Sequence, residues 1–214
     1  GTQMKATGEV MAIERNLEAA LLKAVRSLEI GLIHLEMPEL KALSDEEVRK
    51  RIHLIDDQRL FVIAEAFRRG VTIDEVHDIT KIDKWFLQKL QNIMSTSKEL
   101  HEWGNNHKQI ADMPVDLLRK AKVQGFTDFQ IARAIGFEGD MEEGSLYVRT
   151  HRKQAGILPV VKQIDTLAAE SAHDGIDIGT FGYHGLVYLH VIQQPESYPR
   201  TVNCLDVLVN DSLD

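Results

Sequence analysis

The chain has 214 residues, of which 43% are hydrophobic and 27% are charged, and its formal net charge is −8. This length suits one large or two small domains, and the composition suits a folded core. The acidic balance disfavours general binding to phosphate backbones, although it leaves room for a local basic patch. The single cysteine, Cys204, excludes an internal disulfide and a cysteine-based metal site, and it is typical of a reducing compartment.

The sequence predicts neither a membrane span nor a signal peptide. The apolar run from Leu186 to Val191 contains His190 and is far shorter than the roughly 20 residues that a membrane helix needs. The N-terminal residues Gly1 to Met4 lack a basic region followed by an apolar one. We therefore expect a cytoplasmic protein with no membrane partner.

The first half of the chain shows the apolar spacing of helices after a short strand near Val10 to Ile13. Asn16 is typical of a helix N-cap, and the helix that it opens is expected to end at Gly31. Residues 31–43 contain Pro38 and are predicted to be a connection. Four further helices are expected to begin after Ser44, after Asp56 or Asp57, after Thr72 and after Asp83.

The junction at residues 70–76 carries several local signals at once. Gly70 follows two arginines, as is typical of a helix end. Thr72 and Glu75 have the spacing of a capping box, in which each side chain satisfies a free backbone N–H of the other residue. Val71 and Val76 occupy the positions of a hydrophobic staple. The sequence therefore predicts two helices that meet at this point.

The same pattern recurs about 55 residues later in the chain. Gly125 repeats the helix end, and Thr127 with Gln130 repeats the capping box. Helices are expected from Pro114 to Gly125, from Thr127 to Ile135 and from Ser145 to Gln154. We predict an all-α fold of two helical-hairpin subdomains with short helices, at about residues 31–100 and 105–170.

The helix after Asp83 is predicted to be long, with apolar side chains on one face. These side chains are Ile82, Phe86, Leu90 and Ile93. Trp85 and Phe86 could instead form an aromatic platform for a ligand, but aromatic residues on an apolar helix face are more often core. We therefore predict that Phe86 is buried.

From about residue 171 the character of the sequence changes, and residues 171–214 are expected to form an irregular or β-prone tail. Four glycines crowd residues 175–185. Residues 186–192 and 205–209 favour strands, with Pro195 and Pro199 between them. We place a boundary near residue 170.

No residue pattern points to catalysis. A zinc peptidase helix needs histidines four apart on one face, whereas His101 and His107 lie about 240° apart around a helix. Asp56 and Asp57 are adjacent, so their carboxylates diverge on a helix, and helix capping explains them. No glycine-rich phosphate loop is present. We expect no catalytic, cofactor-binding or metal-binding residue.

A helix-turn-helix remains the alternative. Residues 125–132 resemble the first helix of such a motif, and the next helix carries a basic cluster. This cluster is Arg149, His151, Arg152 and Lys153. Acidic residues precede that helix, however. The helix dipole itself favours acidic residues at the N-terminus of a helix and basic residues at its C-terminus, so the pattern needs no DNA to explain it. Overall acidity argues the same way, so we expect no nucleic-acid partner.

Three segments in order resemble the large subunit of carbamoyl phosphate synthetase. Residues 6–13 with 23–29 resemble the end of its first ATP-grasp unit, which we assign to residues 1–30. Residues 78–87 resemble the most recognisable motif of its oligomerization domain, and residues 158–170 resemble the exit from that domain. The positions that we single out as structural motifs are Thr72, Glu75, Lys81, Asp83, Trp85, Phe86, Thr127 and Gln130.

The resemblance implies a non-catalytic helical connector between two ATP-using halves. The parent enzyme makes carbamoyl phosphate from bicarbonate, glutamine-derived ammonia and two ATP, for pyrimidine and arginine synthesis. Its ATP and Mg²⁺ would bind other domains. The implied partners are further copies of the chain, the adjoining ATP-grasp domains and the glutaminase small subunit.

The sequence departs from this family in two places. Glu14 stands where the family usually has glycine, which would be costly if the position needs a positive φ. From Ser171 onward the sequence no longer resembles the family.

The helix that carries Leu17, Leu21 and Leu28 is expected to pack against the adjoining ATP-grasp unit of the parent enzyme. We therefore expect exposed apolar area and a homodimer with helical residues at its centre, unless the tail folds back over that surface as a hairpin.

Overall fold

The computed structural model describes residues 8–107, 110–159, 187–193 and 205–208. These residues are mainly helical, which confirms the predicted class. In chain order, the elements are β1 (Gly8–Glu14), α1 (Leu17–Ser27), α2 (Pro38–Lys41), α3 (Asp45–Arg51), α4 (Arg59–Arg68), α5 (Ile73–Thr80), α6 (Lys84–Asn106), a short 3₁₀ helix (Ile110–Asp112), α7 (Val115–Val123), α8 (Asp128–Ala134), α9 (Met141–Gln154), β2 (Val187–Gln193) and β3 (Leu205–Leu208).

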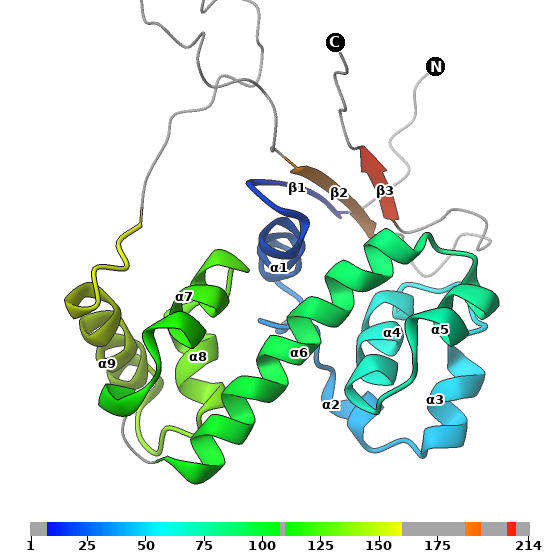
Figure 1. The fold of residues 1–214 in the computed structure, drawn as a ribbon. Coiled ribbons are helices and arrows are strands. Elements are labelled where there is room, and N and C mark those ends of the chain that lie inside the picture. The colour runs from blue at the N-terminus through cyan, green and yellow to red at the C-terminus, as the bar shows by residue number, and fades with distance from the viewer. Residues whose placement is uncertain (1–7, 108–109, 160–186, 194–204, 209–214) are drawn as a thin grey trace, which may run out of the picture.

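The long helix α6 lies between two groups of helices (Figure 1). It has 23 residues, which correspond to about 35 Å. On one side it packs against α4 and α5, and on the other against α7 and α8. Leu87, Leu90 and Ile93 supply part of the apolar face that it buries. Two helical groups therefore share one central helix, whereas the predicted domain boundaries at 30, 100 and 170 stay predictions.

A small antiparallel sheet covers α1, in the strand order β1-β2-β3. Its first pairing runs from Gly8 opposite Gln193 to Glu14 opposite Val187. Both β1 and β2 contact α1 (Figure 1). Leu17 and Leu21 are buried. The structure therefore agrees with the alternative in which the tail folds back, because strand β2 pairs with β3 as a hairpin and helps to cover this helix.

The two strands predicted in the tail are confirmed to within a residue, as β2 and β3. The pairing with β1 could not be predicted, since it joins residues about 180 positions apart. The glycine-rich part of the tail and Cys204 lie outside the described residues, as does most of the predicted exit segment 158–170.

Two glycines let helices approach each other closely. A Cβ added at Gly104 of α6 would lie 2.4 Å from the carbonyl oxygen of Ile135. One added at Gly125 would lie 2.6 Å from the Cα of Ala19 in α1. Real Cβ atoms do not come so near to backbone atoms, so both positions require glycine as the helices stand. Gly125 thus joins the α7–α8 junction to α1.

Several element boundaries differ from those predicted. Helix α1 ends at Ser27, and Glu29 rather than Gly31 is the first residue after it with positive φ, at 54°. Asp56 accepts a hydrogen bond from the backbone N–H of Gln58 at 3.1 Å, but α4 itself starts only at Arg59. Helix α9 starts at Met141, four residues before Ser145, because Asp140 already has the extended backbone of an N-cap.

Glu14 does not need the backbone freedom of glycine. It lies in β1, and it is not among the described residues with positive φ. Its carboxylate accepts from Lys23 Nζ at 3.0 Å, and the same ammonium donates to the carbonyl of Ile13 at 3.2 Å. A glutamate is therefore accommodated here without backbone strain.

Candidate interaction surface

The first junction has the hydrogen bonds that the sequence predicted. The backbone N–H of Glu75 donates to Thr72 Oγ1 at 3.2 Å, and the N–H of Thr72 donates to Glu75 Oε2 at 2.9 Å. Gly70 has a φ of +86°. Hydrogen bonds from Thr72 and from Arg49 lower the pKa of Glu75 to about 2. Each of these contacts stabilises the start of α5, so the residues serve the fold.

The second junction repeats this geometry with a neutral side chain. The N–H of Gln130 donates to Thr127 Oγ1 at 3.1 Å, and the N–H of Thr127 donates to Gln130 Oε1 at 2.7 Å. Gly125 again has a φ of +86°. The amide nitrogen of Gln130 also donates to the carbonyl of Ile33, in the connection after α1. Gln130 is thus buried and ties that connection to α8.

The α5–α6 junction presents an exposed aromatic side chain. Lys81 takes the left-handed conformation with a φ of 59°, and Asp83 caps α6 by accepting from the N–H of Trp85 at 2.8 Å. Trp85 is 47% exposed and packs edge-on against Phe86, with their ring centroids 4.9 Å apart. Lys89 lies over the indole ring at 5.2 Å. Trp85 is thus open to contact from outside.

Phe86 is only half-buried, which corrects the prediction that it is core. The next residue, Leu87, is fully buried instead. Helix α6 is in contact with helices on both sides, so its buried surface is wider than the single apolar stripe from which we predicted. Ile93 and Leu90 are buried as predicted.

The histidines considered as metal ligands contact their own helix instead. His101 Nδ1 lies 2.7 Å from the carbonyl of Ser97, and His107 Nδ1 lies 3.0 Å from that of Trp103. The ring of His107 also stacks on Trp103. Among the residues that the structure describes, no group of three or more His, Cys, Asp or Glu could hold a metal ion. Across the same residues, no helix is long and apolar enough to cross a membrane.

A partly buried ion-pair cluster joins three helices, and no sequence pattern predicted it. Arg152 Nε donates to both carboxylate oxygens of Asp128, and Lys122 Nζ donates to one of them at 2.9 Å. Burial lowers the pKa of Lys122, and the hydrogen bond to Asp128 partly opposes this shift. The three residues come from α7, α8 and α9 and hold these helices together. No local signal reveals the cluster, because Asp128 and Arg152 are 24 residues apart.

This cluster weakens the DNA-binding alternative. Arg152, one of the four basic residues expected to read a groove, is only 9% exposed. Its guanidinium also donates to the carbonyl of Ile157 at 3.1 Å. A side chain that is held in this way cannot reach a base edge or a phosphate. The structure therefore does not favour a helix-turn-helix function.

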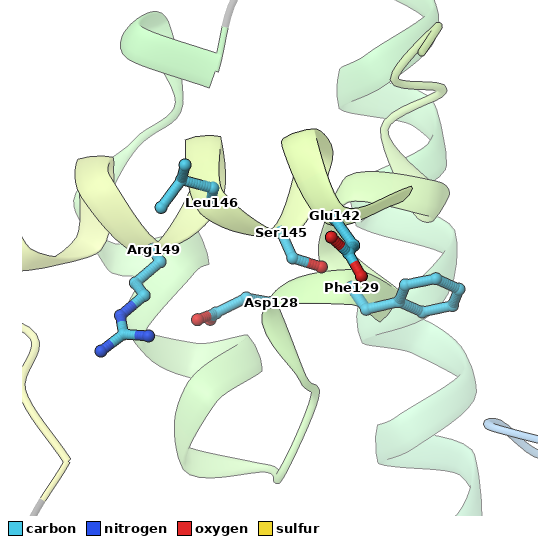
Figure 2. Close-up of a pocket in the computed structure, with 6 residues that line it drawn as sticks. All are labelled: Asp128, Phe129, Glu142, Ser145, Leu146 and Arg149. Carbon is cyan, nitrogen blue, oxygen red and sulfur yellow. The ribbon is translucent and has the colours of Figure 1, made fainter. Parts of the chain in front are cut away.

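The outer face of α9 is the most distinctive exposed surface. Four exposed residues of α9 form what we call the α9 stripe: Glu142, Leu146, Arg149 and Lys153. Successive members are three or four positions apart, so they lie on one side of the helix. Beside the stripe is an open cavity of about 390 Å³, mostly lined by apolar atoms. Figure 2 shows Asp128 and Phe129 of α8 opposite the α9 residues that line it.

These features define a class of protein: a helical domain whose polar clusters cap helices or join them to one another. Residues 9–156 match the family described as carbamoyl-phosphate synthetase large chain, oligomerisation domain. The chain belongs to this family.

Individual relatives agree with this assignment. The chain is 49% identical over 170 residues to the carbamoyl phosphate synthase large chain of Caldanaerobacter subterraneus subsp. tengcongensis. It is 50% identical over 170 residues to the protein of the same name from Thermoanaerobacter pseudethanolicus. Each alignment covers 79% of this chain but 15% of the relative. The chain therefore spans about one seventh of the length of these relatives.

Proposed function

We propose that this chain is the connector and oligomerisation domain of a carbamoyl phosphate synthase large subunit, and that it carries no catalytic residue. The observation that carries the proposal is the family match over residues 9–156. The structure supports it, because the polar clusters in the described residues cap helices or join them to one another. Helix ends and inter-helix ion pairs are structural devices rather than reactive groups.

We infer the rest of the parent enzyme from the resemblance. It would make carbamoyl phosphate from bicarbonate, glutamine-derived ammonia and ATP in the cytoplasm, for pyrimidine and arginine synthesis. ATP and Mg²⁺ would bind its ATP-grasp domains, which would adjoin this chain. A glutaminase small subunit would supply the ammonia. The names of the relatives support the enzyme class.

Self-association is the property of this chain that can be tested directly. Homo-oligomers are most often closed two-fold dimers, so we expect a homodimer or a dimer in exchange with larger species. Sedimentation velocity across a dilution series should show a mass that rises with concentration. A mass that stays near the 24.2 kDa of one chain at every concentration would contradict the proposal.

The same preparation also tests catalytic silence. We expect neither ATP hydrolysis nor carbamoyl phosphate formation from the isolated chain. Turnover that follows the protein through successive purification steps would show that a catalytic site is present and would overturn this part of the proposal.

A further inference from the structure

Helix α9 has two faces of opposite character. The inner face packs on α8 and buries Gly144, Val148 and Arg152. The outer face bears the α9 stripe, and its central Leu146 is 63% exposed. Figure 1 places α9 at the outer edge of its helical group. The stripe is therefore accessible over the 14 residues of the helix, which is about 20 Å.

The order of side chains along the stripe is self-complementary. Acidic Glu142 is at one end, Leu146 is in the middle, and basic Arg149 and Lys153 are at the other end. The point midway between Ser145 and Leu146 is equally far along the helix from Glu142 and from Arg149. A two-fold axis through this point, perpendicular to the helix, would place each acid opposite the base of a second copy. A two-fold contact requires such self-complementarity.

The helix dipole accounts for only part of this pattern. It favours acidic residues in the first turn and basic residues in the last turn. It gives no reason for a large apolar side chain to stand exposed between them, with Tyr147 also 39% exposed beside it. Among the ion pairs of the described residues, none includes Glu142 or Arg149. Both charges therefore remain available to a partner.

We propose that α9 packs antiparallel against α9 of a second copy of this chain, about a two-fold axis near Leu146. Glu142 of each copy then faces Arg149 of the other, so the attraction occurs twice. This inference rests on the proposed self-association and assigns its surface. The occupant is a second copy rather than an unrelated protein because the charges of the stripe complement the stripe itself.

The open cavity beside the stripe fits this arrangement. Its lining includes Phe129 of α8 and Leu146 of α9 (Figure 2). When helices pack side by side, an apolar side chain of one enters a hole between residues of the other. Leu146 of the second copy would enter this cavity, and by symmetry its own cavity would receive Leu146 of the first. The contact would then have an apolar centre and charged ends.

Charge reversal tests the arrangement in the full 214-residue chain. Glu142→Arg and Arg149→Glu each turn two attractive contacts into repulsive ones. Each variant alone should raise the dimer Kd at least about tenfold, since like charges placed opposite each other strongly oppose association. Sedimentation velocity measures the Kd, and circular dichroism checks that each variant is folded. Leu146→Gln changes a side chain that is already exposed in one chain, and it should also weaken the dimer about tenfold.

Mixing the two reversed variants gives a sharper result. In a chain with Glu142→Arg every charged residue of the stripe is basic, whereas a chain with Arg149→Glu has an acidic residue at both positions 142 and 149. An equimolar mixture should form a heterodimer about as tightly as the unmodified chain forms its homodimer. The double variant with both changes should likewise regain its homodimer. Glu46→Arg and Lys50→Glu on α3 are matched controls, because that exposed pair undergoes the same charge changes away from α9.

The possible failures are distinguishable. If the unmodified chain forms a dimer that the α9 variants and the mixture leave unchanged, the α9 contact is overturned while self-association stands. If the α3 controls weaken the dimer as much as the α9 variants, net charge rather than this surface is responsible, which also overturns the contact. A chain that is monomeric at every concentration overturns both this inference and the proposed self-association.

Discussion

The guanidinium of Arg152 and the carboxylate of Asp128 join α9 to the first turn of α8. Arg152 Nε donates to the two carboxylate oxygens at 3.0 and 2.9 Å. Both side chains are largely shielded from solvent. This pair holds one face of α9 against α8, and the α9 stripe on the opposite face therefore stays exposed to solvent.

Removing one partner of this pair should destabilise the fold. Asp128→Ala leaves two cations, Arg152 and Lys122, without their acceptor in a mostly buried place. We expect a loss of about 3 kcal/mol in the free energy of unfolding, measured by urea denaturation. Glu102→Ala is the matched control, because its pair with Lys98 is exposed and should contribute less than about 1 kcal/mol. Equal losses for the two variants would show that the cluster is not a stabilising feature.

Gly70 and Gly125 offer a comparison of backbone strain with close packing. Both have a φ of +86°, so an alanine at either position costs about 1–2 kcal/mol for the left-handed backbone. A Cβ at Gly70 meets nothing within 4 Å, whereas one at Gly125 collides with Ala19. Gly125→Ala should therefore cost roughly 1–3 kcal/mol more than Gly70→Ala. Matching urea midpoints for the two variants would mean that α1 moves aside easily.

Acid should weaken the first capping box but not the second. The pKa of Glu75 is lowered from 4.5 to about 2 in the folded chain. Its contribution to stability is therefore complete above about pH 4.5 and is lost as the pH falls towards 2. Gln130 occupies the same position of the second box and does not titrate.

Two variants measure this difference. The stability advantage of the unmodified chain over Glu75→Gln should shrink between pH 6 and pH 3. The cost of Gln130→Ala should stay constant over the same range. These free energies come from urea denaturation at each pH. A Glu75→Gln effect that does not vary with pH would show that hydrogen bonding to Thr72 and Arg49 does not shift the pKa.

The corrected position of Phe86 changes what its removal should do. A buried phenylalanine costs about 3–5 kcal/mol when it is replaced by alanine. Phe126, which is 2% exposed, should show a loss of this size. Phe86 is half-buried beside Trp85, so Phe86→Ala should cost roughly half as much or less. Urea denaturation of the two variants makes the comparison, and a Phe86 loss as large as that of Phe126 would place Phe86 in the core after all.

The helix starts show how much of this fold the sequence specifies. Asn16, Ser44, Thr72, Asp83 and Thr127 were each predicted to cap a helix, and each side chain accepts the expected backbone hydrogen bond. Such a bond joins residues two or three positions apart. Residue type and spacing are therefore enough to predict it, whatever the rest of the chain does.

Three features depended on tertiary structure: the partial exposure of Phe86, the Asp128–Arg152 pair, and the strands that cover α1. Sequence periodicity shows that a helix has an apolar face, but not how many neighbouring helices meet it, so Leu87 rather than Phe86 became core. Asp128 and Arg152 pair only because α8 and α9 pack together. Likewise, the tail could be predicted to form strands, whereas its return to β1 is a long-range pairing. Contacts of this kind arise from the packing of the whole chain, and no local pattern encodes them.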